Sequence, residues 1–180
     1  METNCRGITR TYNGDYDKLF TAGRRLAKKG TVVLVRGLPG SGKSYLAEKL
    51  RSLTEAEMKV CAADDYFYDE NGVYNFDPTK LPEAHLRCQS NAFAYYSIDE
   101  LAFVANTFTM RWEMEPYLFF AETFGLNVLV LNLFDAGLSD EELAQRNTHG
   151  VPMEAIAQMR ARFEHDWRSA DPRPPWEREG

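Results

Sequence analysis

Residues 31–44 read TVVLVRGLPGSGKS, an apolar run followed at once by a glycine-rich turn. The run TVVLV at 31–35 is continuous and β-branched, which is typical of a strand buried on both faces. Residues 37–44, GLPGSGKS, match the pattern G-x-x-x-x-G-K-[ST] in full. Helical spacing of apolar residues follows over 44–53. A buried strand, a phosphate-binding loop and a helix in this order indicate an α/β fold that binds a nucleoside triphosphate.

Each residue type in this loop has a chemical task. Glycines let the backbone approach a phosphate, and the N–H groups at the start of the following helix attract the anion. Lys43 would bring a positive charge to the β and γ phosphates, and Ser44 a hydroxyl ligand for Mg²⁺. We therefore expect ATP and Mg²⁺ as cofactors. The residues expected to contact the nucleotide are Gly37, Leu38, Pro39, Gly40, Ser41, Gly42, Lys43, Ser44, Tyr45 and Arg146.

Strands and helices alternate on both sides of the loop. The pattern predicts strands over 31–35, 59–63, 100–105 and 127–134, and helices over 15–29, 44–53, 82–96, 110–124, 139–146 and 152–167. Right-handed crossovers then give a mostly parallel sheet covered on both faces. Ligands of such sheets bind at the carboxyl ends of the strands.

The domain plan that follows is simple. We expect one domain over 15–168, preceded by a flexible N-terminus at 1–14 and followed by a flexible, Pro-rich tail at 169–180. The predicted fold class is a three-layer α/β sandwich with a helical lid.

The composition limits which cellular compartment and which binding partners we expect. The 180 residues carry a formal charge of -6, which argues against a protein that coats nucleic acid non-specifically. The three cysteines are scattered, and no secretory signal or apolar run of about 18 residues is present, so we expect a cytoplasmic protein with no membrane partner. A basic cluster, Arg24, Arg25, Lys28 and Lys29, is interpreted as a solvated helix face, with nucleic-acid contact as the alternative.

An acid pair, Asp64-Asp65, follows the predicted second strand. A carboxylate there can take the proton of an acceptor hydroxyl and align it for attack on the γ-phosphate. The alternative is a turn or a helix cap, since Asp is common in both. The position one βαβ unit after the phosphate loop favours catalysis.

Residues 145–152 join two helical segments and could form a mobile lid. A lid arginine, here Arg146, could stabilise charge on the transferred group, although on the residues alone a solvated helix position is favoured. Asp135, after the strand at 127–134, is a reserve Mg²⁺ ligand. The three histidines, His85, His149 and His165, form no metal-binding pattern.

Several segments together resemble the polynucleotide-kinase-like branch of the P-loop kinases. They are RGLPGSGKS (36–44), ADDYF (63–67), FDPTKLPEAH (76–85), NT (106–107), WEMEPY (112–117) and RNTHGVP (146–152). The resemblance implies a P-loop kinase-type sandwich in which Asp64 is the general base. It also implies that Lys43 and Arg146 contact the phosphates, and that Asn106 and Thr107 help to place the acceptor.

Two departures from this family concern the acceptor. Phe67 stands where kinases of polynucleotide 5′ ends have an arginine, and Ala105 stands where many relatives have an acid. Aromatic residues near the acid pair could stack on an extruded base, with core packing as the alternative. These aromatics are Tyr66, Phe67, Tyr68 and Trp112.

The chain also looks like the compact bacteriophage kinases that phosphorylate 5-hydroxymethyluracil in DNA, which would place it in the host cytoplasm. We therefore expect a nucleic-acid substrate, DNA rather than RNA. The residues expected to bind it are Asp65, Phe67, Asn106, Thr107 and Trp112. A 5′-hydroxyl polynucleotide kinase and a non-catalytic nucleotide-binding adaptor that docks a partner through its tail are the alternatives.

Overall fold

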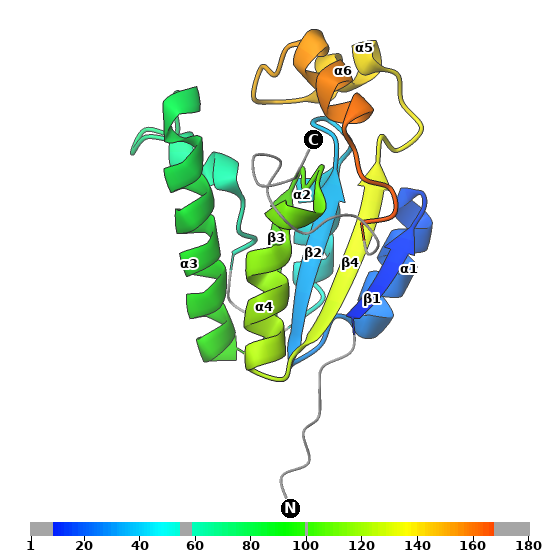
Figure 1. Cartoon of the computed structure of the whole chain (residues 1–180), viewed down its shortest axis with the longest axis vertical. Coiled ribbons are helices and arrows are strands. Elements are labelled where there is room, and N and C mark those ends of the chain that lie inside the picture. The colour runs from blue at the N-terminus through cyan, green and yellow to red at the C-terminus, as the bar shows by residue number, and fades with distance from the viewer. Residues whose placement is uncertain (1–8, 55–58, 100, 168–180) are drawn as a thin grey trace, which may run out of the picture.

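The computed structural model describes residues 9–54, 59–99 and 101–167 (Figure 1). Four strands form one sheet in the order β1-β4-β2-β3, and all three pairings between them are parallel. The strands are β1 (Thr9–Asn13), β2 (Thr31–Gly37), β3 (Leu101–Asn106) and β4 (Asn127–Phe134). β2 and β3 are buried along their whole length, as the apolar runs in the sequence predict.

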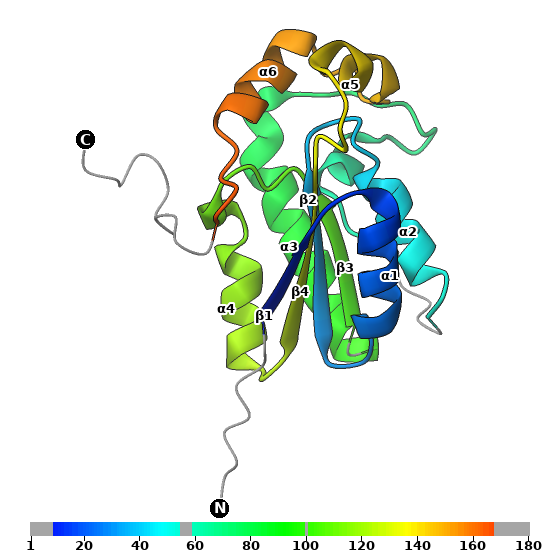
Figure 2. The ribbon, with the colours of Figure 1, turned by 90° about the vertical axis from the view of Figure 1, so that its right-hand side faces the viewer.

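Helices cover the sheet on both faces, and the three-layer arrangement is confirmed (Figure 2). α1 and α2 lie on one face and α4 on the other, while α3 packs beside β3. α5 and α6 lie above the carboxyl ends of the strands. The helices are α1 (Tyr16–Leu26), α2 (Lys43–Arg51), α3 (Leu81–Asp99), α4 (Glu115–Thr123), α5 (Asp140–Arg146) and α6 (Met153–Ala161).

Local signals explain where two of these helices begin. Asp15 caps α1 by accepting a hydrogen bond from the Lys18 amide at 2.9 Å. At α5, Ser139 and Glu142 form the reciprocal pair that the sequence Ser-Asp-Glu-Glu predicts. Both starts agree with the predicted helices.

The N-terminal prediction was wrong for residues 9–13. They form the edge strand β1, which pairs with β4 from Thr9 opposite Val128 to Asn13 opposite Asn132. The sequence TRTYN carries no apolar run because this edge strand is largely exposed, and backbone pairing with β4 holds it. Residues 1–8 lie outside the described part of the chain, and so do 168–180, which include the predicted tail.

Two other predicted elements are shorter than expected. In the segment 59–63 only Cys61 pairs with a strand, as an isolated bridge to Val104, before the chain turns into the short 3₁₀ helix η1 (Ala63–Phe67). The last helix ends at Ala161 rather than at 167. Three residues later, the amide of Glu164 donates to the Thr109 carbonyl at 2.8 Å instead of to a carbonyl of the helix. Among the described residues, none of the helices is long and apolar enough to cross a membrane.

α5 and α6 form a lid that is docked on the phosphate loop. Leu38 of the loop packs with Leu143, Ile156 and Phe163 in a small apolar cluster separate from the main core. At Gly40, a Cβ atom would lie 2.3 Å from the carbonyl oxygen of Leu143. The lid backbone can therefore rest on the loop only because residue 40 has no side chain.

A buried arginine that the sequence analysis did not single out connects the segment after α6 to the rest of the fold. Arg36, at the end of β2, is fully buried and donates to the carbonyls of Phe108 (3.0 Å), Glu164 (3.0 Å) and Thr109 (3.4 Å). Its guanidinium lies 4.1 Å from the centre of the Phe163 ring. Burial lowers the pKa of Arg36 to about 10, and the carboxylates of Glu113 and Glu164 oppose that shift.

We predict that Arg36→Met lowers the free energy of unfolding by about 3 kcal/mol, because three carbonyl oxygens lose their donor. Arg162→Met is the matched control. Arg162 is exposed and its side chain donates to the Thr109 hydroxyl at 3.2 Å, so the loss there should be about 1 kcal/mol or less. Urea unfolding of both variants measures the difference. Equal losses would contradict the role given to Arg36.

A second prediction concerns the seat of the lid, which is the contact between the Leu143 carbonyl and Gly40. Gly40 and Gly42 both have positive φ, 79° and 93°, but a Cβ at Gly42 meets no atom within 4 Å. Gly42→Ala should therefore cost only backbone strain, about 1–2 kcal/mol. Gly40→Ala should cost at least about 1 kcal/mol more and speed amide hydrogen exchange in α5 and α6, because its methyl group displaces the lid. Identical exchange in the two variants would argue against this seat.

Candidate active site

Backbone hydrogen bonds hold the phosphate loop between the carboxyl ends of β4 and β3. The Leu38 amide donates to the Phe134 carbonyl at 2.7 Å, and the Gly37 amide donates to the Thr107 carbonyl at 3.2 Å. The loop then enters α2 through Gly42, the N-cap residue. Thr107, predicted to contact the acceptor, thus supports the loop through its main chain.

The polar groups of the loop fit a bound triphosphate. The Ser41 hydroxyl is buried and has no hydrogen-bond partner within the described residues. Lys43 Nζ donates to the Leu38 carbonyl at 2.9 Å, and Ser44 lies exposed in the first turn of α2. An anionic phosphate would satisfy the ammonium and the hydroxyl, and Ser44 is placed to hold Mg²⁺. Ser44 and Tyr45, predicted to contact the nucleotide, are both exposed at this start of α2.

Lys43 is an unusually weakly basic lysine in the protein without nucleotide. Desolvation by burial lowers its pKa to about 8, although the negative charge of Asp64 acts in the opposite direction. The effect of the Asp64 charge on Lys43 is consistent with the predicted proximity of the acid to the phosphate loop. The sequence placed the two residues together on topology alone.

Asp64 lies in η1 and is about half exposed. Its Oδ1 accepts from the Tyr74 hydroxyl at 3.0 Å, and its Oδ2 lies 3.1 Å from Nδ1 of His149. Burial alone would raise the pKa of Asp64. The bonds from His149 and Tyr74 and the charge of Lys43 outweigh it, so the pKa is lowered and the carboxylate is ionised at neutral pH.

Asn106 fixes the backbone that carries Asp64. It is buried at the end of β3, and its Oδ1 accepts from the Ala63 amide at 2.8 Å while its Nδ2 lies 3.5 Å from the Cys88 sulfur. Asp65 accepts from the Ala62 amide at 3.0 Å and so caps η1. The structure gives Asn106 a supporting role and Asp65 the capping role that was the alternative interpretation.

The predicted aromatic contacts are revised. Phe67 is only 5% exposed and packs against Tyr66, Tyr74 and Phe76, so it is a core residue and not a stacking surface. Trp112 lies partly buried in η3 (Arg111–Glu113), a segment whose hydrogen bonds reach Glu164 and Trp167. The predictions for Phe67 and Trp112 overestimated the exposure of their rings, because burial of a single aromatic side chain depends on tertiary packing.

The exposed aromatic surface lies instead on the segment after η1. Tyr68 is 42% exposed and Phe76 is 52% exposed, and both rings contact Tyr74, the residue bonded to Asp64. His149 of the lid stacks on Tyr74 with ring centres 4.7 Å apart. The sequence analysis named Tyr68 but missed Tyr74, Phe76 and this role of His149. The segment ADDYF indicates where the site lies, but no local sequence pattern predicts the contact between Tyr74 and His149.

Arg146 and Asp135 come from different elements of the lid region, Arg146 from α5 and Asp135 from the segment after β4. Arg146 is exposed in the last turn of α5, the helix whose Leu143 carbonyl faces Gly40. Asp135 forms a close ion pair with Arg160 of α6 and accepts from the Gly137 amide at 2.9 Å. Asp135 therefore anchors the lid, which makes its use as a Mg²⁺ ligand a poor fit.

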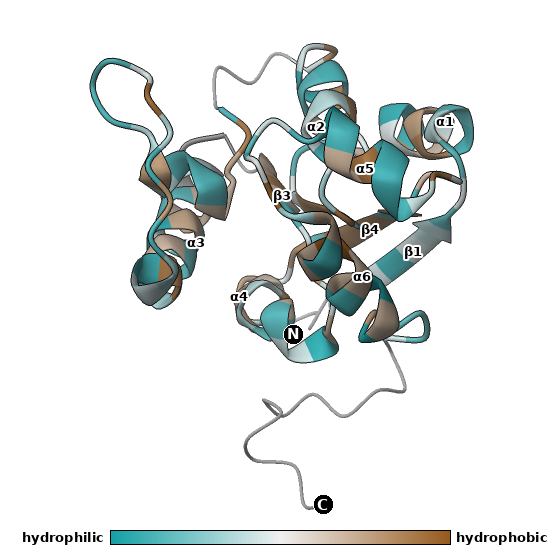
Figure 3. Cartoon of the chain, turned by 90° about the horizontal axis from the view of Figure 1, so that it is seen from above, coloured by the Kyte–Doolittle hydropathy of each residue, from teal (hydrophilic) through white to brown (hydrophobic). Residues whose placement is uncertain are grey.

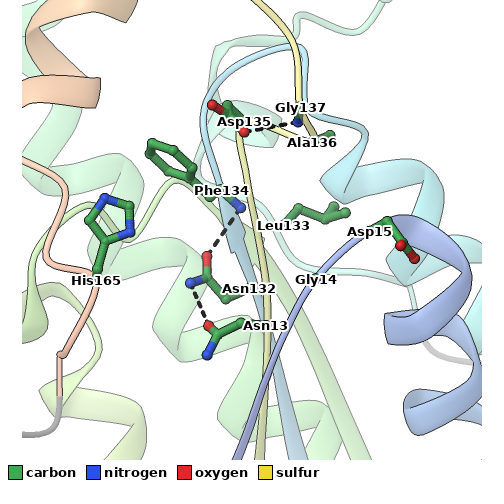
Figure 4. Close-up of a pocket in the computed structure, with 10 residues that line it drawn as sticks. All are labelled: Asn13, Gly14, Asp15, Asn132, Leu133, Phe134, Asp135, Ala136, Gly137 and His165. Carbon is green, nitrogen blue, oxygen red and sulfur yellow. Dashed lines mark hydrogen bonds between the residues drawn. The ribbon is translucent and has the colours of Figure 1, made fainter.

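A pocket of about 570 Å³ opens where β1 and β4 end (Figure 4). Asn132 of β4 ties the two strands by donating to Asn13 Oδ1 at 2.8 Å, and within β4 it accepts from the Phe134 amide at 3.1 Å. This volume is in the range of small-ligand sites, about 300–1,000 Å³. Because the Phe134 carbonyl also holds Leu38, the pocket adjoins the phosphate loop.

Comparison with known proteins agrees with this geometry. A family model described as an AAA domain matches residues 32–165. The human protein NEDD4-binding protein 2 is 39% identical over 130 residues, which are 71% of this chain but 7% of that protein. The matched region contains the phosphate loop, Asp64 and the lid. The chain therefore belongs to this AAA domain family, a family of P-loop, kinase-like nucleotide-binding proteins.

Proposed function

We propose that the chain is an ATP- and Mg²⁺-dependent kinase that phosphorylates a hydroxyl group of a nucleic acid, most specifically the hydroxymethyl group of 5-hydroxymethyluracil in DNA. The observation that carries the proposal is Asp64. Its carboxylate oxygens lie 3.0 Å from the Tyr74 hydroxyl and 3.1 Å from Nδ1 of His149, and its negative charge acts on Lys43 of the phosphate loop. A site for nucleotide binding alone has no need of such a carboxylate.

The residues would share the chemistry as follows. Asp64 accepts the proton of the acceptor alcohol while that oxygen bonds to the γ-phosphorus and the bond to the leaving ADP oxygen breaks. Lys43 and Arg146 stabilise the negative charge on the phosphates during transfer. Mg²⁺, when bound with the nucleotide beside Ser44, supplies neutralisation of phosphate charge.

The surroundings of Asp64 favour a base as the acceptor. Tyr68 and Phe76 present exposed rings beside the Tyr74–Asp64 pair, and aromatic rings bind bases by stacking. The family's acceptor-holding arginine is replaced by Phe67, which is buried in the core. A 5′-end kinase would have to hold the acceptor's phosphate without that guanidinium, which makes it the weaker candidate.

A binding role without chemistry is the competing candidate from another class. The human relative is named for binding NEDD4, and the similarity covers only 7% of that protein. An adaptor of this kind would use the phosphate loop for nucleotide-dependent binding only. It would not require the Asp64 carboxylate to be held by Tyr74 and His149.

We predict that the protein transfers the γ-phosphate of ATP to DNA that contains 5-hydroxymethyluracil, and that Asp64→Asn reduces the rate by about 10²–10⁴-fold through loss of the general base. Asp65→Asn is the matched control, because an amide oxygen can still accept the Ala62 bond and activity should remain. ATP binding should persist in both variants.

Nucleoside mass analysis after reaction with hydroxymethylated and plain DNA distinguishes the candidates. Phosphate on the modified nucleoside supports the main proposal. Label that a phosphatase specific for ends removes indicates a 5′-hydroxyl kinase. No turnover with any acceptor, and equal behaviour of Asp64→Asn and the unaltered protein, would leave only the adaptor.

A second prediction uses the lowered pKa of Lys43. Since the ammonium loses its charge as pH rises through about 8, ATP affinity should fall by up to about tenfold between about pH 7 and about pH 9. Arginine stays protonated in this range, so Lys43→Arg should bind ATP with an affinity that varies little with pH. Titration with a fluorescent ATP analogue measures both slopes, and parallel slopes would refute the assignment.

A further inference from the structure

The loop between α5 and α6 carries His149, and hydrogen bonds from Asn147 hold its backbone. Nδ2 of Asn147 donates to the carbonyls of Ala144 (2.8 Å) and Val151 (3.2 Å), and its Oδ1 accepts from the Val151 amide at 2.8 Å. His149 lies at the middle of this braced loop. These bonds fix the conformation of the loop and with it the position of the imidazole.

The imidazole reaches across the site to the predicted base. Nδ1 of His149 lies 3.1 Å from Oδ2 of Asp64, and the ring stacks on Tyr74 with an interplanar angle of 16°. Tyr74 holds the other carboxylate oxygen at 3.0 Å. One lid residue and one residue of the 68–76 segment thus fix both oxygens of Asp64.

We propose that His149 is the positioning residue through which the docked lid orients Asp64 for catalysis. This inference rests on the proposed function. A carboxylate offers about four lone-pair sites, so bonds from His149 and Tyr74 leave room for the acceptor hydroxyl. His149 acts through Asp64 and does not itself take the proton from the acceptor.

The lid would then deliver two groups in one movement. Arg146 and His149 are three residues apart on the same lid, whose seat is the contact between Leu143 and Gly40. When the lid is seated, His149 contacts Asp64, and we expect Arg146 to reach the bound phosphates. Without the lid contact, Asp64 would keep only its bond from Tyr74, and transfer would slow.

Charged and titratable groups reach Asp64 from each element around it. They are Lys43 on α2, Asp65 on η1, Tyr74, Cys88 on α3 and His149 on the lid. Of these, His149 and Tyr74 bond directly to the carboxylate. Removing the His149 bond should therefore raise the pKa of Asp64, and the acid limb of the pH–rate profile should move to higher pH.

Two substitutions test this inference with a matched geometry. The amide nitrogen of His149→Asn lies close to the position of Nδ1, whereas that of His149→Gln lies closer to Nε2. His149→Gln should lose up to about 100-fold in kcat with unchanged ATP affinity, because Asp64 is no longer held in line. His149→Asn should retain most of the activity, and the acid limb should move less in it than in His149→Gln.

The titration of the Asp64 carboxyl carbon, followed by NMR in the protein without nucleotide, supplies a readout independent of turnover. Its midpoint should rise in His149→Gln. An unchanged midpoint, or equal loss of kcat in both variants with no movement of the acid limb, would overturn the inference while the kinase function stands. If the unaltered protein phosphorylates no acceptor, the proposed function fails, and the positioning role is overturned with it.

Discussion

The close approach of two backbones, at Gly40 of the phosphate loop and Leu143 of the lid, is the constraint on which the site depends. A Cβ at residue 40 would lie 2.3 Å from the Leu143 carbonyl, so a glycine is required there for steric reasons as well as for phosphate binding. The apolar cluster around Leu38 holds this contact in place. Because the lid carries both Arg146 and His149, its seat on the loop decides where both side chains lie.

Two arginines, the partly exposed Arg160 and the buried Arg36, hold the lid from its other end. Arg160 bonds to Asp135 at the end of β4, to Asp140 at the start of α5 and to the Leu138 carbonyl, so α6 is tied to the sheet and to α5. Arg36 ties the segment after α6 to the loop that follows β3. Guanidinium groups suit this task because their donors point in fixed directions toward several acceptors at once. Seen from above, α5 and α6 lie over the sheet (Figure 3).

The parts of the fold that the sequence predicted are those set by local chemistry. The phosphate loop, the β2 and β4 runs and the capped start of α5 depend on neighbouring residues, and all are confirmed. The edge strand β1 was missed because a half-exposed edge needs only backbone pairing. Phe67 was misplaced because its burial depends on residues 74 and 76 folding over it. The Asp64–His149 contact joins residues 85 positions apart, and no short-range pattern reports it.

The distribution of charge also bears on how an acceptor would be recognised. The chain carries a net charge of -6, and its most basic stretch, Arg24 to Lys29, lies at the far end of α1, away from the lid (Figure 2). Nucleic-acid contact by that cluster is therefore separate from the site around Asp64. Near Asp64 the rings of Tyr68 and Phe76 are exposed. Stacking on such rings involves the base, whereas ion pairing involves the backbone phosphates. Under the function proposed above, this arrangement suits an acceptor hydroxyl carried by a base that stacks on Tyr68 or Phe76.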